Sequence, residues 1–193
     1  MDAIPRGTAD RARADLLPAG RPAAQLIQIC FVVSDLDASL RRFSATFGAG
    51  PWFLATTPAG RADPTVYRGR PTPLDAEIAL AYGGDVMYEL VRPRPGSVSV
   101  FREGVDRSGL GIHHLGFATE DFDATLSRLG SEGRELLCTS VTPRGARVAI
   151  VGGGPPLGVL EEYIELTPAT REFYAHMRAR AAEWDGRELV CQG

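Results

Sequence analysis

The sequence contains an internal repeat, and this feature most limits the folds that the chain can adopt. When the chain is shifted by 86 positions, QICFVVSDLDASLRRF (28–43) aligns with HLGFATEDFDATLSRL (114–129). The positions that are identical in the two segments are Phe31/Phe117, Asp35/Asp121, Asp37/Asp123, Ala38/Ala124, Leu40/Leu126 and Arg42/Arg128. Such self-similarity indicates that one supersecondary unit occurs twice in the chain.

Each copy is expected to form a β-α-β-β-β module. A short β-rich segment leads to an acidic residue, Asp35 or Asp121, that can cap a following helix. Apolar residues then recur at helical spacing: Leu36, Leu40, Phe43 and Phe47 in the first copy, and Phe122, Leu126 and Leu129 in the second. Strand-like segments follow at 76–84 and 86–93, and again at 146–153 and 160–167. We therefore predict an α+β fold.

The rest of the chain lies on either side of this double unit. We expect a flexible arm over 1–23, a first module over about 24–95, a second over about 109–167, and a helical extension over 168–193. The predicted extension helix starts after Pro168 and carries one apolar face, with His176 off it: Phe173, Met177, Ala181 and Trp184. This face is expected to pack on the sheet or on a second subunit.

Composition excludes several classes of function. All 21 basic residues are arginine, so neither a lysine Schiff base nor a Walker A phosphate loop is possible. A net charge of −3 argues against nucleic-acid binding. No apolar stretch resembles a signal peptide or membrane span, so we expect a cytoplasmic protein with a small-molecule partner. The three cysteines, Cys30, Cys138 and Cys191, are expected to be free thiols, although a nucleophilic Cys30 remains conceivable.

The repeat also selects four residues that can bind a metal. The shift of 86 positions aligns Gln28 with His114, and a second register, shifted by 76, aligns MYEL (87–90) with YIEL (163–166) and so Glu89 with Glu165. One histidine, two carboxylates and one amide suit a divalent ion such as Zn, Ni, Co or Fe. Neighbouring strand residues point to opposite faces, so we expect His114 to face the site and His113 to face away.

The segments VVSDLDASLRRFSATFGAGPWF, GIHHLGFATEDFDATL and YIEL resemble the vicinal oxygen chelate superfamily, which includes glyoxalases, methylmalonyl-CoA epimerases, extradiol dioxygenases and bleomycin-resistance proteins. The resemblance covers about residues 24–167. It implies a U-shaped mixed sheet around one divalent metal, held by Gln28, Glu89, His114 and Glu165. This set is similar to that of zinc-type glyoxalase I, whereas the two histidines and one glutamate of extradiol dioxygenases do not fit Gln28.

The same resemblance bears on the substrate. Glyoxalase I grips glutathione with an Arg, an Asn and an Arg at positions where this chain has Val32, Pro93 and Leu110. The resemblance therefore implies metal-assisted chemistry on a substrate other than a glutathione adduct.

From this resemblance we expect a divalent-metal-dependent isomerase, epimerase or lyase that forms a metal-stabilised enolate of a small oxygen-rich substrate. Glu165 is the first candidate for the base and Glu89 the second. Tyr163 could orient the substrate, or merely pack in the cavity, and Arg92 could meet a substrate carboxylate, or remain a solvated arginine. The alternatives are a tailoring enzyme that cyclises or rearranges a larger metabolite, and a non-catalytic binding or resistance protein. We expect a homodimer.

Overall fold

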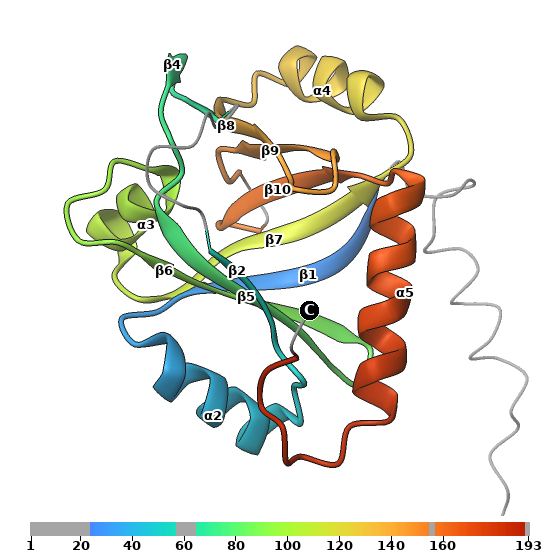
Figure 1. Cartoon of the computed structure of the whole chain (residues 1–193). Coiled ribbons are helices and arrows are strands. Elements are labelled where there is room, and N and C mark those ends of the chain that lie inside the picture. Colours follow the sequence, from blue (N-terminus) through green and yellow to red (C-terminus); the bar gives the residue numbers. More distant parts are fainter. Residues whose placement is uncertain (1–23, 57–64, 155–156, 192–193) are drawn as a thin grey trace, which may run out of the picture.

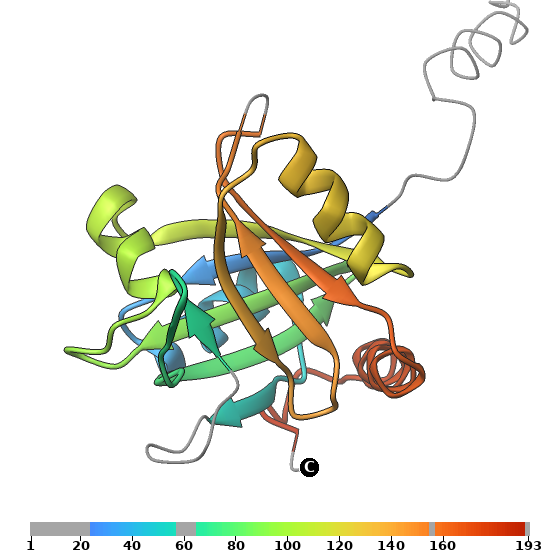
Figure 2. The ribbon, with the colours of Figure 1, turned by 90° about the horizontal axis from the view of Figure 1, so that it is seen from above.

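The computed structural model describes residues 24–56, 65–154 and 157–191 (Figures 1 and 2). The predicted arm over 1–23 lies outside these residues. The elements follow in this order along the chain: β1 (Gln25–Val32), α2 (Leu36–Phe47), β2 (Phe53–Thr56), β3 (Val66–Tyr67), β4 (Arg70–Pro71), β5 (Ala76–Gly83), β6 (Val86–Pro93), α3 (Val100–Ser108), β7 (Gly111–Thr119), α4 (Phe122–Ser131), β8 (Leu136–Val141), β9 (Arg147–Val151), β10 (Leu160–Glu165) and α5 (Pro168–Ala182).

The strands form one mixed sheet built from two similar halves. Its order is β2-β5-β6-β1-β7-β10-β9-β8-β3-β4. Strands β1 and β7 pair antiparallel at the centre, β6 pairs parallel to β1, and β10 pairs parallel to β7. The predicted α+β fold with two β-α-β-β-β modules is therefore confirmed. The short strands β3 and β4 follow β2 in the chain but extend the other edge of the sheet, because β3 pairs with β8.

The helices α2 and α4 begin where the repeat predicts them. The carboxylates of Asp35 and Asp121 each accept a hydrogen bond, at 2.9 Å, from the backbone N–H three residues later. Each cap satisfies an N–H group that has no partner within its helix. Leu40 of α2 and Leu129 of α4 are both 2% exposed, so the predicted apolar stripes pack on the outer face of the sheet.

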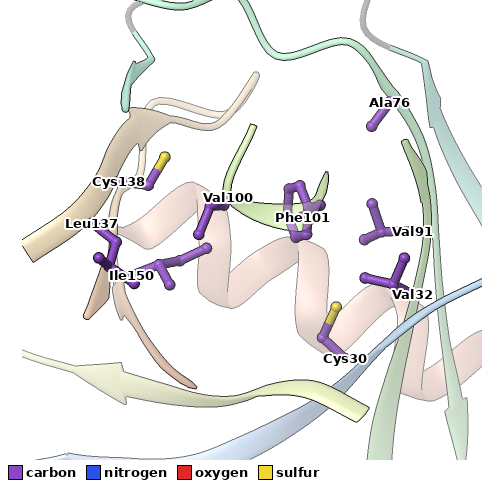
Figure 3. Close-up of a cluster of buried hydrophobic side chains, with 9 residues drawn as sticks. All are labelled: Cys30, Val32, Ala76, Val91, Val100, Phe101, Leu137, Cys138 and Ile150. Atoms are coloured by element: carbon purple, nitrogen blue, oxygen red, sulfur yellow. The ribbon is translucent and has the colours of Figure 1, made fainter. Parts of the chain in front are cut away.

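The opposite, inner face of the sheet is filled at one end by α3, a helix that the sequence pattern did not reveal. Val100 and Phe101 of this helix pack against Cys30 of β1 and Ile150 of β9 (Figure 3). Side chains from both halves of the sheet thus face one another across α3. This arrangement makes the sheet U-shaped around a shared interior, as expected.

Helix α5 packs beside the first half of the sheet (Figure 1). Met177 is 1% exposed and clusters with Phe173, Tyr82 and Met87, so the predicted apolar face docks within the chain. Trp184 was expected on this face but lies beyond the end of the helix, where its indole N–H donates to a backbone carbonyl of the C-terminal segment. None of the helices in the described part of the chain is both long and apolar enough to span a membrane.

Candidate metal centre

Four polar side chains from the four central strands meet on the inner face of the sheet. We call them the acid–histidine cluster: Gln28 of β1, Glu89 of β6, His114 of β7 and Glu162 of β10. Nε2 of His114 lies 3.3 Å from Oε2 of Glu89 and 3.3 Å from Oε2 of Glu162. The Gln28 amide donates to Oε2 of Glu89 at 2.7 Å and lies 3.5 Å from Oε2 of Glu162. All four donors therefore converge on one small volume.

The backbone pairing explains this convergence. In the first module, Glu89 pairs with Cys30, and Cys30 follows Gln28 by two residues. In the second module, Glu162 pairs with Gly116, and Gly116 follows His114 by two residues. The two carboxylates thus occupy equivalent places in the two modules, because the parallel strands pair in the same register in both.

Each member of the cluster is almost completely withdrawn from solvent. His114 is 0% exposed, Gln28 3%, and Glu89 and Glu162 8% each. Burial raises the pKa of the Glu162 carboxyl, and the negative charge of Glu89 adds to that effect. Burial acts on Glu89 too, but the charge of His114 and its close Nε2–Oε2 contact outweigh burial and lower the pKa of Glu89. Burial opposes protonation of His114, yet its neighbours Cys30 and Glu162 raise its pKa well above the usual range.

The cluster fits a divalent ion. Nε2 of His114 is buried without a hydrogen-bond partner of acceptable geometry, although it faces two carboxylates. The ligand atoms of Glu89, His114 and Glu162 all lie within 4.8 Å of one another. Tetrahedral Zn–N and Zn–O bonds of about 2.0–2.2 Å separate neighbouring ligand atoms by roughly 3.3–3.6 Å. The observed 3.3 Å separations match that spacing.

His113 does not face away from the cluster, so the expectation based on strand alternation is wrong. Cys30 of β1 pairs with His114, but the next residue, Phe31, pairs with Ile112. His113 is therefore the extra residue of a β-bulge, which locally breaks the alternation of side chains. Its Nδ1 lies 2.9 Å from Nδ1 of His114, and it is itself 6% exposed.

Cys30 lies against the cluster but is not set up as a nucleophile. It is 0% exposed, and burial together with the charge of Glu89 raises the pKa of its thiol. A reactive cysteine needs the opposite shift, because the thiolate is the nucleophile. The thiol also groups with His113 and His114 as a second set of close ligand atoms. His113 therefore has two conceivable roles, ligand or neighbour of a ligand.

Tyr174 places α5 near the cluster. Its side chain belongs to the same apolar group as Tyr82 and Met87, and Met87 precedes Glu89 by two residues on the same face of β6. Burial raises the pKa of the Tyr174 hydroxyl, and the charges of Glu162 and Glu89 raise it further. Helix α5 therefore covers the inner face on one side of the cluster, while α3 fills it on the other.

This geometry can be compared with known proteins. Residues 27–150 match the family model described as the glyoxalase/bleomycin resistance protein/dioxygenase superfamily. The chain belongs to this superfamily. It is the vicinal oxygen chelate superfamily that the sequence resembles, so the predicted family is confirmed. No curated protein sequence matches the chain.

Solved structures share the superfamily fold with this chain. A methylmalonyl-CoA epimerase variant of Streptomyces coelicolor, in complex with 2-nitronate-propionyl-CoA, is 20% identical with a TM-score of 0.57, and the match covers 77% of this chain and 98% of that one. The epimerase of Mycobacterium tuberculosis is 23% identical with a TM-score of 0.57, over 84% and 99% of the two chains. A hypothetical protein of Bacillus halodurans C-125 is 19% identical with a TM-score of 0.56, over 76% and 96%.

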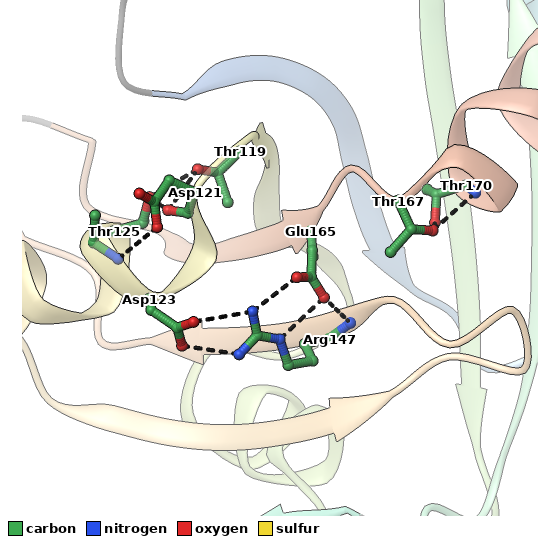
Figure 4. A network of polar contacts seen from close by, with 9 residues as sticks. Thr119, Asp121, Asp123, Thr125, Arg147, Glu165, Thr167 and Thr170 are labelled. Carbon is green, nitrogen blue, oxygen red and sulfur yellow. Dashed lines mark hydrogen bonds and ion pairs between the residues drawn. The ribbon is translucent and has the colours of Figure 1, made fainter.

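Of the four residues expected to form the superfamily's metal site, Gln28, Glu89 and His114 lie together and Glu165 does not. Glu165 follows Glu162 by three residues in β10 and therefore faces the outer side of the sheet. Its carboxylate accepts hydrogen bonds from the Arg147 guanidinium at 2.7 and 3.0 Å (Figure 4). This ion pair lowers the pKa of Glu165. Glu162 takes the place expected for Glu165.

The two residues expected to bind substrate also lie away from the cluster. Tyr163 is stacked on Phe117 under α4, and its hydroxyl donates to Glu161 at 2.8 Å. It therefore packs on the outer face, as its position between Glu162 and Ile164 requires. Arg92 pairs with Glu77 and lines a small surface pocket beside the start of α2. Neither side chain therefore lies on the inner face of the sheet, which carries the cluster.

Proposed function

We propose that this protein is a divalent-metal-dependent enzyme that removes and returns a proton next to a carbonyl group of a small oxygen-rich substrate, and so acts as an isomerase, epimerase or lyase. The observation that carries this proposal is the acid–histidine cluster, in which a buried, unpartnered histidine nitrogen faces two carboxylates and an amide. A cluster of this kind is costly to bury unless a cation neutralises it. A protein that only enclosed an apolar ligand would not need it.

Gln28, Glu89, His114 and Glu162 would hold the ion. A bound divalent ion would supply Lewis-acid stabilisation for the negative charge that develops on a substrate oxygen. The amide N–H of Gln28 donates to Oε2 of Glu89 at 2.7 Å, and this bond fixes the side chain beside the two carboxylates. Gln28 would bind the ion through its carbonyl oxygen, because the amide nitrogen is only a donor. Buried donors that are already in place cost no reorganisation during the reaction.

Glu162 is the candidate base in place of Glu165. The Gln28 amide lies 2.7 Å from Glu89 but 3.5 Å from Glu162, so Glu162 is the less constrained of the two carboxylates. A carboxylate that can shift its contacts can take a proton from the substrate and return it. Glu89 would then remain the more firmly held of the two.

The substrate is not expected to be a glutathione adduct, because Val32 and Leu110 offer no group that can bind a carboxylate. The structural neighbours that are methylmalonyl-CoA epimerases support a carbon-acid substrate as the first class to test. A cyclising or rearranging tailoring enzyme would use the same donors on a larger substrate. Only the substrate distinguishes these two functions.

The test combines metal analysis with proton exchange. The purified protein, loaded with Zn, Ni, Co or Fe(II), is incubated in deuterated water with methylmalonyl-CoA and with a panel of small 2-hydroxy and 2-oxo carbonyl compounds. We expect one ion per chain and metal-dependent loss of a substrate C–H signal. Glu162→Gln should keep much of the metal but lower the exchange rate by about 10² to 10⁴. If the protein binds one ion per chain but exchanges no proton of any compound, whichever metal is loaded, the non-catalytic binding or resistance protein would be favoured.

A further inference from the structure

The contacts of His113 extend the proposed metal site by one residue. Two neighbouring histidines bring their Nδ1 atoms to 2.9 Å, a distance at which one nitrogen donates a proton and the other accepts it. Which nitrogen is the donor decides where His114 carries its proton, and therefore whether its Nε2 can bind a metal. The second nitrogen of His113 settles the direction.

Nε2 of His113 lies 3.1 Å from the carbonyl oxygen of Val100 in α3. A carbonyl oxygen only accepts hydrogen bonds, so Nε2 of His113 must carry a proton. The ring of His113 is 6% exposed and packs 4.9 Å from Phe101, surroundings that favour the neutral imidazole. A neutral imidazole protonated at Nε2 has a lone pair at Nδ1 and can only accept there.

We propose that His113 is a positioning residue that fixes the tautomer of His114. Nδ1 of His114 must donate to Nδ1 of His113, and this leaves the lone pair of neutral His114 on Nε2. That atom is the one that faces Glu89 and Glu162. Metal-binding histidines commonly donate their other ring N–H to a fixed acceptor, which orients the ring and makes it a better ligand. Here a second histidine, placed by a β-bulge, is that acceptor.

Helix α3 also contributes to the site. Val100 is the first residue of α3, and its carbonyl group orients His113 from outside the sheet. Gly104 lies against the same ring, and a Cβ atom at this position would come within 2.4 Å of Cδ2 of His113. Helix α3, which lies between the two modules, therefore contacts the histidine pair at His113. The carboxylates of the cluster contact the pair at His114.

This inference rests on the proposed metal site, so the experiment tests the two separately. The full-length chain is titrated with Zn²⁺ against a chelator, and the loaded protein, labelled with ¹⁵N in its three histidines, is studied by long-range ¹H–¹⁵N NMR. His114→Ala should abolish tight binding; if it does not, the proposed metal site is wrong. In the unaltered protein we expect His113 protonated only at Nε2 and His114 protonated at Nδ1. A proton on Nδ1 of His113, or zinc on either of its nitrogens, would overturn the inference alone.

Two substitutions at position 113 separate positioning from ligation. His113→Leu removes the acceptor and should weaken Zn²⁺ binding about 10- to 100-fold. His113→Asn places a carbonyl oxygen where Nδ1 stands, so it should restore most of the affinity although asparagine is a poor zinc ligand. Equal loss in both variants would show that His113 is itself a ligand, and unchanged affinity in both would show that it only packs. The NMR measurement on the unaltered protein does not depend on whether either variant folds.

Discussion

Gly116 and Gln28 face each other across the central strand pair so closely that no side chain can be accommodated at position 116. The two residues pair between β1 and β7, and a Cβ atom on Gly116 would lie 2.8 Å from the Cβ of Gln28. We therefore expect Gly116→Ala to displace Gln28 and weaken Zn²⁺ binding, by about tenfold or more if the loss resembles that of other supporting residues.

The matched control is Gly130→Ala. Gly130 lies in α4, where a Cβ atom would meet nothing within 4 Å. Alanine is favoured over glycine inside a helix by up to about 1 kcal/mol, so this variant should keep its metal affinity and gain stability. Both quantities are measured by chelator competition and by urea unfolding. Equal zinc affinity in Gly116→Ala and the unaltered protein would mean that Gln28 does not contribute to the site.

A second prediction separates the two acidic residues of β10. Glu162→Ala should lose most of the bound metal, because it removes a carboxylate 3.3 Å from Nε2 of His114. Glu165→Ala should keep the metal, because that carboxylate pairs with Arg147 on the outer face. Arg147 is exposed and Glu165 partly exposed, so their ion pair is worth about 1 kcal/mol or less, and the second variant should also remain folded. Metal content is measured on both proteins after identical loading. If Glu165→Ala lost the metal and Glu162→Ala kept it, Glu165 and not Glu162 would be the fourth ligand.

These residues also illustrate what the sequence could and could not predict. The repeat aligned Gln28 with His114, and both side chains do lie in the acid–histidine cluster, because the two segments that contain them are similar over 16 residues. The last strand offered only the short match of MYEL to YIEL, in a segment with acids at 161, 162 and 165. That match aligns Glu89 with Glu165, whereas the strand pairing in the structure makes Glu89 equivalent to Glu162, three residues earlier. The correct register depends on backbone hydrogen bonds, which a four-residue similarity does not encode.

The position of His113 was missed for a different reason. Alternation of side chains holds only in a regular strand, and the pairing of β7 with β1 skips this residue. The helix α3 was missed as well, although Ser99 caps it by accepting from the backbone N–H of Arg102. Its nine residues include a glycine, and a short helix of this kind is stabilised by the core it enters rather than by its own sequence.

A third prediction concerns glutathione. Val32 is 2% exposed in an apolar cluster, and Leu110 is an exposed apolar side chain, so neither can bind the carboxylates of glutathione. We expect negligible turnover of the methylglyoxal–glutathione hemithioacetal by the metal-loaded protein, followed by its ultraviolet absorbance. A kcat/KM above about 10⁴ M⁻¹s⁻¹ would show that another part of the chain binds glutathione.

A fourth prediction tests the helix cap of the second module. Asp121→Ala removes the acceptor for the backbone N–H of Ala124 and should lower the free energy of unfolding by about 1 kcal/mol. Asp121→Asn keeps an oxygen at the same place and should cost much less. Urea unfolding followed by circular dichroism measures both changes. If the two variants lose equal stability, the charge of Asp121 matters and its hydrogen bond does not.

The last prediction concerns the docking of α5 within the chain. Met177 is 1% exposed, and it belongs to an apolar cluster with Met87 of β6, against which Phe173 and Ala181 of its own helix also pack. Removing a buried methionine side chain leaves a cavity and costs about 2–5 kcal/mol. Met177→Ala should therefore lower the free energy of unfolding by that amount.

The neighbouring residue His176 is exposed, so His176→Ala should change stability by about 0.5 kcal/mol or less. Urea unfolding at several protein concentrations measures both variants. A loss for Met177→Ala that is independent of concentration places α5 on its own sheet. A loss that appears only at high concentration would mean that the helix packs on a second copy of the chain, and similar stability of the two variants would mean that α5 is not docked at all.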